Sequence, residues 1–123
     1  MSPEFRLLQQ AIEDGHNIAA TYRGHDRLMT PHTLGWKRNR EQCLLYQYGG
    51  SSSSQTRFRE NSPDNWRCLR VDRLFNLRIV DGDLQTCTRH TQRQTCVDDV
   101  LCEVDFSKIA IGLDDEKAEN RRR

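Results

Sequence analysis

The sequence feature that most constrains the fold is a series of short runs of alternating apolar residues, separated by turn residues. These runs predict a small β-rich fold. Ile18, Ala20 and Tyr22 share one face of the first run, which ends at the turn sequence RGHD. Pro31 lies inside the second run and marks a strand edge or a bulge, because proline cannot donate a backbone hydrogen bond to a neighbouring strand. The polar sequence KRNRE then predicts a hairpin. Together these signals predict strands at residues 17–22, 27–36, 42–50, 66–72 and 74–81.

A helix is predicted before the first strand. Ser2 is a typical N-cap, Pro3 suits the first helical position, and Gly15 suits the C-cap. One face of this helix is apolar: Phe5, Leu8, Ala11 and Ile12. Residues 66–80 are apolar enough for a helix as well, but alternation in their second half favours strands. We therefore predict a mainly β domain, a strongly bent sheet or barrel preceded by an N-terminal α-helix.

The length of 123 residues allows one modest core. We expect an N-terminal helix, a small barrel, a C-terminal extension and a flexible charged tail, at residues 1–16, 17–82, 83–113 and 114–123. No run approaches the roughly eighteen apolar residues of a membrane span, and the acidic N-terminal sequence differs from a secretory signal. These features predict a cytoplasmic protein without membrane contact. Five cysteines, an odd number, favour free thiols in a reducing compartment.

Three arginines interrupt the apolar run at residues 65–80: Arg67, Arg70 and Arg73. On a straight strand Arg67 and Arg73 share a face about 20 Å apart, and Arg70 points the other way. One interpretation is that each arginine lies at a strand end, with its stem packed on apolar surface and its charge paired with an acid such as Asp72.

The other interpretation is that the arginines gather over one mouth of the barrel. This requires a sharp bend at residues 71–74 and further cations from neighbouring strands, such as Arg27 or Lys37. The charge distribution favours an anionic partner. Residues 21–93 hold 13 Lys and Arg against 7 Asp and Glu, whereas residues 94–123 hold 5 against 8.

Four sequence blocks, in order, resemble those of the WYL domain family: AIEDGHNIAATY, PHTLGW, CLLYQYGGSSSS and WRCLRVDRLFNL. The similarity covers about residues 7–82 and is greatest to stand-alone members of the family. The resemblance implies an Sm/SH3-like small β-barrel that serves as a regulatory, ligand-sensing module in bacteria. It further implies a basic patch that binds negatively charged ligands, including nucleotides or nucleic acids, with Arg70 and Arg73 at the positions of the patch arginines.

The chain departs from the family at the motif that gives it its name. Cys43, Leu44 and Leu45 occupy the Trp, Tyr and Leu positions, so the stacking and hydroxyl groups of that motif are missing. Nearby aromatic residues are candidates to replace them: Tyr46, Tyr48 and Trp36.

A second candidate contact lies in the long loop GGSSSSQTRFRENSPDN, where Phe58 stands between Arg57 and Arg59. Alternating basic and aromatic residues allow phosphate contacts and base stacking on single-stranded nucleic acid, although a solvated loop has the same composition. The chain lacks a helix-turn-helix before the barrel, so sequence-specific operator reading is not expected.

Cys87, His90, Cys96 and Cys102 are of the residue types that bind zinc, but their spacing fits no common zinc motif, so we predict no metal and no cofactor. None of the four histidines belongs to a catalytic motif, so no enzymatic activity is expected. The leading hypothesis is a domain that binds an anionic ligand, a nucleotide or single-stranded nucleic acid. The alternative is a protein-interaction module that forms a homodimer or binds a regulatory protein through its strand edges.

Overall fold

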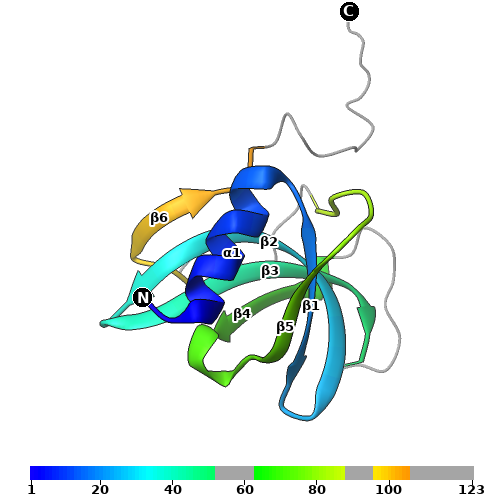
Figure 1. The fold of residues 1–123 in the computed structure, drawn as a ribbon, viewed down its shortest axis with the longest axis horizontal. Coiled ribbons are helices and arrows are strands. Elements are labelled where there is room, and N and C mark those ends of the chain that lie inside the picture. Colours follow the sequence, from blue (N-terminus) through cyan, green and yellow to red (C-terminus); the bar gives the residue numbers. More distant parts are fainter. Residues whose placement is uncertain (52–62, 88–95, 106–123) are drawn as a thin grey trace, which may run out of the picture.

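The computed structural model describes residues 1–51, 63–87 and 96–105 (Figure 1). In these residues one α-helix and two short 3-10 helices accompany six strands. The elements are α1 (Pro3–Asp14), β1 (Asn17–Tyr22), β2 (His25–Lys37), β3 (Arg40–Gly50), η1 (Pro63–Asn65), β4 (Trp66–Arg70), η2 (Val71–Arg73), β5 (Phe75–Val80) and β6 (Asp99–Glu103). None of the described helices is both long and apolar enough to cross a membrane.

Helix α1 is formed as its sequence predicts. The Ser2 hydroxyl accepts a hydrogen bond from the backbone N–H of Phe5 at 3.1 Å, which satisfies one of the free donors of the first turn. Gly15 ends the helix at φ +75°, a left-handed conformation that glycine adopts without steric cost. The predicted apolar face is buried in full: Phe5, Leu8, Ala11 and Ile12. Phe5 stacks on Trp36 of β2, with ring centroids 5.0 Å apart.

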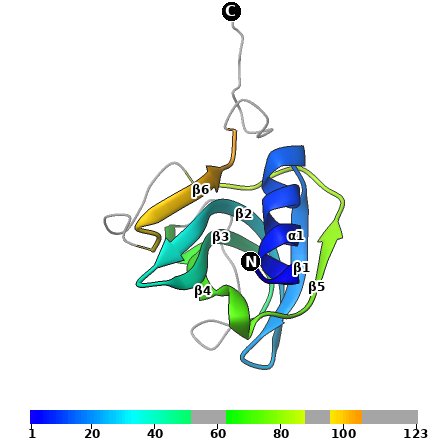
Figure 2. The same ribbon diagram turned by 60° about the vertical axis from the view of Figure 1, so that its left-hand side comes forward.

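The sheet is antiparallel, with the strand order β4-β3-β2-β1-β5. Strand β2 is long enough to have two partners on one side: its first half pairs with β1 and its second half with β6 (Figures 1 and 2). The register of β2 with β3 shifts between Pro31 and Thr33, so of the two predicted alternatives, a strand edge or a bulge, the proline marks a bulge. Arg38 and Asn39 form the predicted β2–β3 turn with positive φ.

The predicted strands at 66–72 and 74–81 are present, but the first ends two residues early. Residues Val71–Arg73 form a single 3-10 turn, and the backbone N–H of Leu74 donates to the Val71 carbonyl at 3.1 Å. The chain therefore changes direction here, between β4 and β5 (Figure 2). Among the described strands β4 and β5 do not pair with each other, so the sheet is open and the predicted barrel closure is not confirmed.

The core lies between α1 and one face of the bent sheet. Directly opposed residues of paired strands point to the same face. Leu34, Cys43 and Leu69 form such a row across β2, β3 and β4, and each is buried in the core cluster. Leu45, also on this face, is fully buried and stands opposite Arg67. Arg67 is therefore on the core side of β4.

The segment after β5 is fixed to the sheet by a polar network around Asn17, which is fully buried. The side-chain amide of Asn17 donates to the Asp83 carbonyl at 2.9 Å, and its oxygen accepts a hydrogen bond from the Thr30 hydroxyl. Thr30 in turn accepts from the backbone N–H of Gln85 at 2.9 Å, and His32 Nε2 donates to the Gln85 carbonyl at 3.0 Å. Because three of these bonds join strand residues to Asp83 and Gln85, this segment is part of the folded unit.

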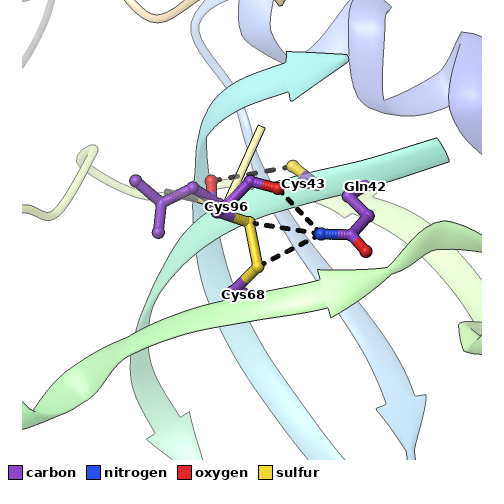
Figure 3. Close-up of a disulfide and its surroundings, with 5 residues drawn as sticks. Gln42, Cys43, Cys68 and Cys96 are labelled. Atoms are coloured by element: carbon purple, nitrogen blue, oxygen red, sulfur yellow. Dashed lines mark hydrogen bonds between the residues drawn. A yellow bond between two sulfur atoms is a disulfide. The ribbon is translucent and has the colours of Figure 1, made fainter. Parts of the chain in front are cut away.

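A disulfide joins Cys68 of β4 to Cys96, three residues before β6, with Cα atoms 5.6 Å apart (Figure 3). The side-chain N–H of Gln42 donates to the Cys96 carbonyl at 2.8 Å, beside the two sulfur atoms. The expectation that all thiols are free is therefore wrong for this pair. The other three cysteines do not form a disulfide: Cys43, Cys87 and Cys102. Disulfides are rare in reducing compartments, so this bond weighs against the predicted cytoplasmic location.

The disulfide also removes Cys96 from the cysteine and histidine set that was considered for zinc. His90 lies outside the described residues. Within residues 1–51, 63–87 and 96–105, no three His, Cys, Asp or Glu side chains are grouped closely enough to hold a metal ion.

Candidate anion-binding sites

The first basic site lies where β4 turns into β5. Arg70 forms a bidentate ion pair with Asp72, through Nη2 at 2.8 Å and Nε at 3.1 Å. The hydrogen bond from Arg70, together with the positive charges of Arg70, Arg73 and Arg40, lowers the pKa of the Asp72 carboxyl below its ordinary value. The charges of three arginines therefore act on this carboxylate, and one of them, Arg70, is paired with it directly. We refer to Arg40, Arg70 and Arg73 as the basic corner.

The basic corner is open to solvent. Arg40, Asp72 and Arg73 are exposed, and Arg70 is partly buried. Since the charges of these three arginines act on the single carboxylate of Asp72, the basic corner carries an excess of positive charge. An arginine in an exposed pair retains donors that face water. The corner can therefore contact a phosphate backbone or another anion without a change in the fold.

Arg67 lies in a different environment from Arg70 and Arg73. It is partly buried and donates to the side-chain oxygen of Gln47 at 3.2 Å and to the carbonyls of Asp64 and Trp66 at 2.7 and 3.0 Å. Burial, followed by the charge of Arg27, lowers its pKa, and the charge of Asp64 acts in the opposite direction.

Arg27, on β2, is the cation beside Arg67. Only 4% of its surface is exposed. Its Nη1 donates to the same Gln47 oxygen at 3.3 Å, and its Nη2 donates to the Tyr22 carbonyl at 3.1 Å. Its guanidinium carbon lies 5.2 Å from the centroid of the Tyr22 ring, a cation–π contact. Its Nε is buried and has no hydrogen-bond partner among the described residues. We refer to Arg27 and Arg67 as the arginine pair.

The structure thus divides the three predicted arginines between two sites. The bend at residues 71–74 is present and places Arg73 and Arg70 beside Asp72. It does not bring Arg67 to them, because neighbouring residues of β4 alternate between faces: Arg67 stands opposite Leu45 and Arg70 opposite Gln42. The interpretation that gathers all three arginines in one cluster is therefore not supported, whereas the pairing of an arginine with Asp72 in the other interpretation is observed for Arg70.

Arg27 and Arg40 complete these sites, and only Arg27 was among the cations predicted from the sequence. Arg27 was considered as a cation that a neighbouring strand could supply, and it does approach Arg67. Arg40 was missed, because the hairpin sequence KRNRE has the composition of any solvated turn. Only the pairing of β3 with β4 shows that Arg40, the first residue of β3, lies near Asp72.

The aromatic candidates are placed by packing and hydrogen bonding. Tyr46 is buried; its hydroxyl accepts from the Asn65 side chain at 3.2 Å, and its ring meets Trp66 edge-on at 5.1 Å. Tyr48 is partly buried and hydrogen-bonds to Asn17, and burial raises its pKa. Trp36 packs on α1, as described above. The other predicted contacts, Arg57, Phe58 and Arg59, lie outside the described residues.

Comparison with known proteins gives no assignment. No protein-family model matches the chain, and neither a curated protein nor a solved structure is significantly similar to it.

Proposed function

We propose that this chain is a non-enzymatic domain of the WYL-like kind that binds a phosphate-bearing ligand, a nucleotide or single-stranded nucleic acid, at the basic corner. The observation that carries the proposal is the bidentate pair of Arg70 with Asp72, a carboxylate on which the charges of Arg73 and Arg40 also act. Two of these arginines, Arg70 and Arg73, are the residues that the WYL resemblance assigns to a ligand-binding patch. We also infer that the bent, open sheet corresponds to an Sm-like barrel.

The physical basis is electrostatic. Guanidinium groups present several N–H donors in a plane and match two oxygens of a phosphate group at once. The bidentate pair with Asp72 keeps Arg70 in place, and the neighbouring Arg73 is exposed to solvent. Binding of this kind is expected to be sensitive to salt and weakly dependent on base sequence.

The test is titration of a fluorescent single-stranded oligonucleotide at low ionic strength. Arg73→Ala is expected to weaken binding about fivefold, the effect of losing one exposed charge contact of ~1 kcal/mol. Asp72→Asn removes the neutralising charge with little change in shape and is expected to strengthen binding. Arg78→Ala serves as the matched control. Arg78 is also exposed, but it lies on β5 opposite Ala19 of β1, away from Asp72 in the sheet. Equal affinity for wild type, Arg73→Ala and Asp72→Asn would contradict the proposal.

A second candidate function, a protein-interaction module, is favoured by exposed apolar side chains on β5 and β6. Phe75 is 65% exposed and Val100 is 50% exposed. Large apolar side chains in water at strand ends and edges suit pairing with another chain. Light scattering during size-exclusion chromatography distinguishes the two functions. A stable dimer that Phe75→Ser converts to a monomer supports the interaction module, and a monomer at all concentrations argues against self-association.

A further inference from the structure

The Cys68–Cys96 disulfide is a chemically reactive bond that the proposed function does not use. Its two ends differ in accessibility: Cys68 lies on β4 and is exposed, whereas Cys96 is only 5% exposed. Exchange begins with attack of a thiolate on one of the two sulfur atoms, and access decides which one is attacked. An external thiol therefore reaches Cys68, and Cys96 is the leaving group. Exposed disulfides are the labile ones, whereas structural disulfides resist reduction.

The surroundings of Cys96 suit a leaving thiolate. The side-chain N–H of Gln42 donates to the Cys96 carbonyl at 2.8 Å and lies 3.4 Å from the sulfur of Cys68 and 3.9 Å from that of Cys96 (Figure 3). An N–H group beside a sulfur atom stabilises the negative charge that forms there when the S–S bond breaks. The bond to the carbonyl does not involve sulfur, so it keeps Cys96 beside Cys68 after the disulfide opens.

The surroundings of Cys68 are positively charged. Successive residues of a strand alternate between faces, so Cys68 and Arg70 of β4 share one face. Gln42, whose amide contacts both sulfur atoms, stands directly opposite Arg70 in the pairing of β3 with β4. The disulfide therefore adjoins the basic corner. Reactive cysteines lie in partly exposed, electropositive surroundings of this kind, because positive charge stabilises the thiolate.

Strand β6 is held by backbone bonds as well as by the disulfide. β3 and β2 lie between β4 and β6, so the disulfide connects segments that are not neighbours in the sheet. The backbone N–H of Asp98 donates to the Trp36 carbonyl at 2.9 Å, and that of Val104 donates to the His32 carbonyl at 2.7 Å. These two bonds flank β6, so the strand stays in place when the disulfide opens and the bond can form again.

We propose that Cys68 is a site of S-thiolation by an anionic low-molecular-weight thiol. The thiolate of the ligand attacks the Cys68 sulfur and forms a new S–S bond. The Cys68–Cys96 bond breaks, and its electron pair stays on Cys96, which takes a proton from water. The ligand sulfur is thereby oxidised and Cys96 is reduced, and attack of the Cys96 thiolate on Cys68 reverses the step. The carboxylates of the ligand are attracted by the basic corner, whether or not the corner also binds nucleic acid.

The direct test uses reduced glutathione, an anionic thiol, on the wild-type protein without denaturant. Acid stops the exchange, the remaining thiols are labelled with N-ethylmaleimide in urea, and peptide mapping by mass spectrometry locates each group. Glutathione is expected on Cys68 and the maleimide on Cys96. Glutathione on Cys96, an even distribution between the two, or a disulfide that reacts only after unfolding would each overturn the proposal.

Two single variants form a matched pair, because each lacks the disulfide and keeps one of its sulfur atoms. With oxidised glutathione, Cys96→Ser is expected to form the mixed disulfide at least about tenfold faster than Cys68→Ser, since its thiol is the exposed one. Circular dichroism shows whether both variants are folded, and the wild-type experiment decides if either is not. Equal rates for two folded variants would contradict the proposal.

The preference for an anionic ligand is measured in the Cys96→Ser background with two disulfides of opposite charge, oxidised glutathione and the cationic cystamine. Arg70→Gln is expected to lower the ratio of the two rates about threefold, the effect of one exposed charge contact. Arg78→Gln, on β5, is expected to leave the ratio unchanged. A ratio that Arg70→Gln does not lower would refute the anionic character of the ligand. Failure of oligonucleotide binding changes none of these expectations.

Discussion

Removal of the Cys68–Cys96 disulfide is expected to destabilise the domain strongly. The bond connects β4, an edge strand of five residues, to the segment that leads into β6, across a sequence separation of 28. In the chain-entropy account, a cross-link of this span lowers the entropy of the unfolded chain and so raises its free energy by about 3.5 kcal/mol at 25 °C. That is a large part of the free energy of unfolding of a small domain, which is typically about 5–15 kcal/mol.

The assay is urea unfolding of the Cys68→Ser/Cys96→Ser variant. With a slope of about 1.5 kcal/mol per M, the lost free energy lowers the midpoint by about 2 M urea. Reductant is expected to shift the wild type by a similar amount and the double variant not at all. Cys102→Ser is the control for loss of a thiol, because Cys102 is unpaired and only partly buried.

Two results would refute this reasoning. If the double variant and wild type unfold at the same urea concentration, the bond does not restrict the unfolded chain. If reductant leaves the wild-type midpoint unchanged while mass spectrometry shows two additional hydrogens, the cross-link is formed but contributes nothing to stability.

Three other predictions follow from local geometry. Gly35→Ala is expected to detach β6, because a Cβ at this position would lie 1.9 Å from the Asp99 carbonyl oxygen; hydrogen exchange of β6 checks this, and unchanged protection would refute it. Burial, and then nearby negative charges, raise the pKa of Cys102 to about 11, so alkylation at pH 8 is expected to be slow and to accelerate towards pH 11. The pKa of Asp72 is lowered in the fold, so the stabilisation from its pair with Arg70 is complete above the ordinary carboxyl pKa and is lost as the pH falls through the lowered value. In an NMR titration of Asp72, Arg70→Ala is expected to raise the midpoint, and an unchanged midpoint would contradict this.

Local structure was predictable from the sequence wherever one segment determines it. The caps and apolar face of α1 depend on residues within a few positions of one another, and Ser2 and Gly15 act as predicted. The bulge at Pro31 follows from its missing N–H, a property of that residue alone. The turn at Val71–Arg73 is the bend that one interpretation of the arginines required, but the strand predicted over residues 66–72 did not indicate its 3-10 form.

Contacts between distant segments were not predictable in the same way. Cys68 and Cys96 meet only because the chain after β5 returns over the sheet, held by residues such as Asn17 and Thr30. An odd cysteine count carries no information about which two thiols become neighbours.

The candidate sites show the same division. Arg67, Arg70 and Arg73 were identified from sequence as cations in an apolar run, but their grouping depends on strand register. The alternation of β4 sends Arg67 to the core side, where Arg27 of β2 meets it through Gln47. A neutral glutamine between two arginines has no signature in a linear sequence.

The salt dependence of oligonucleotide binding tests the anion-binding account most directly. For a single-stranded ligand, each phosphate contact contributes about −0.7 to the slope of log affinity against log salt concentration. Wild type is expected to show a clearly negative slope, and the Arg70→Ala/Arg73→Ala variant a slope less negative by about 1.4. The same slope for both proteins, or an affinity that does not change with salt, would contradict the account.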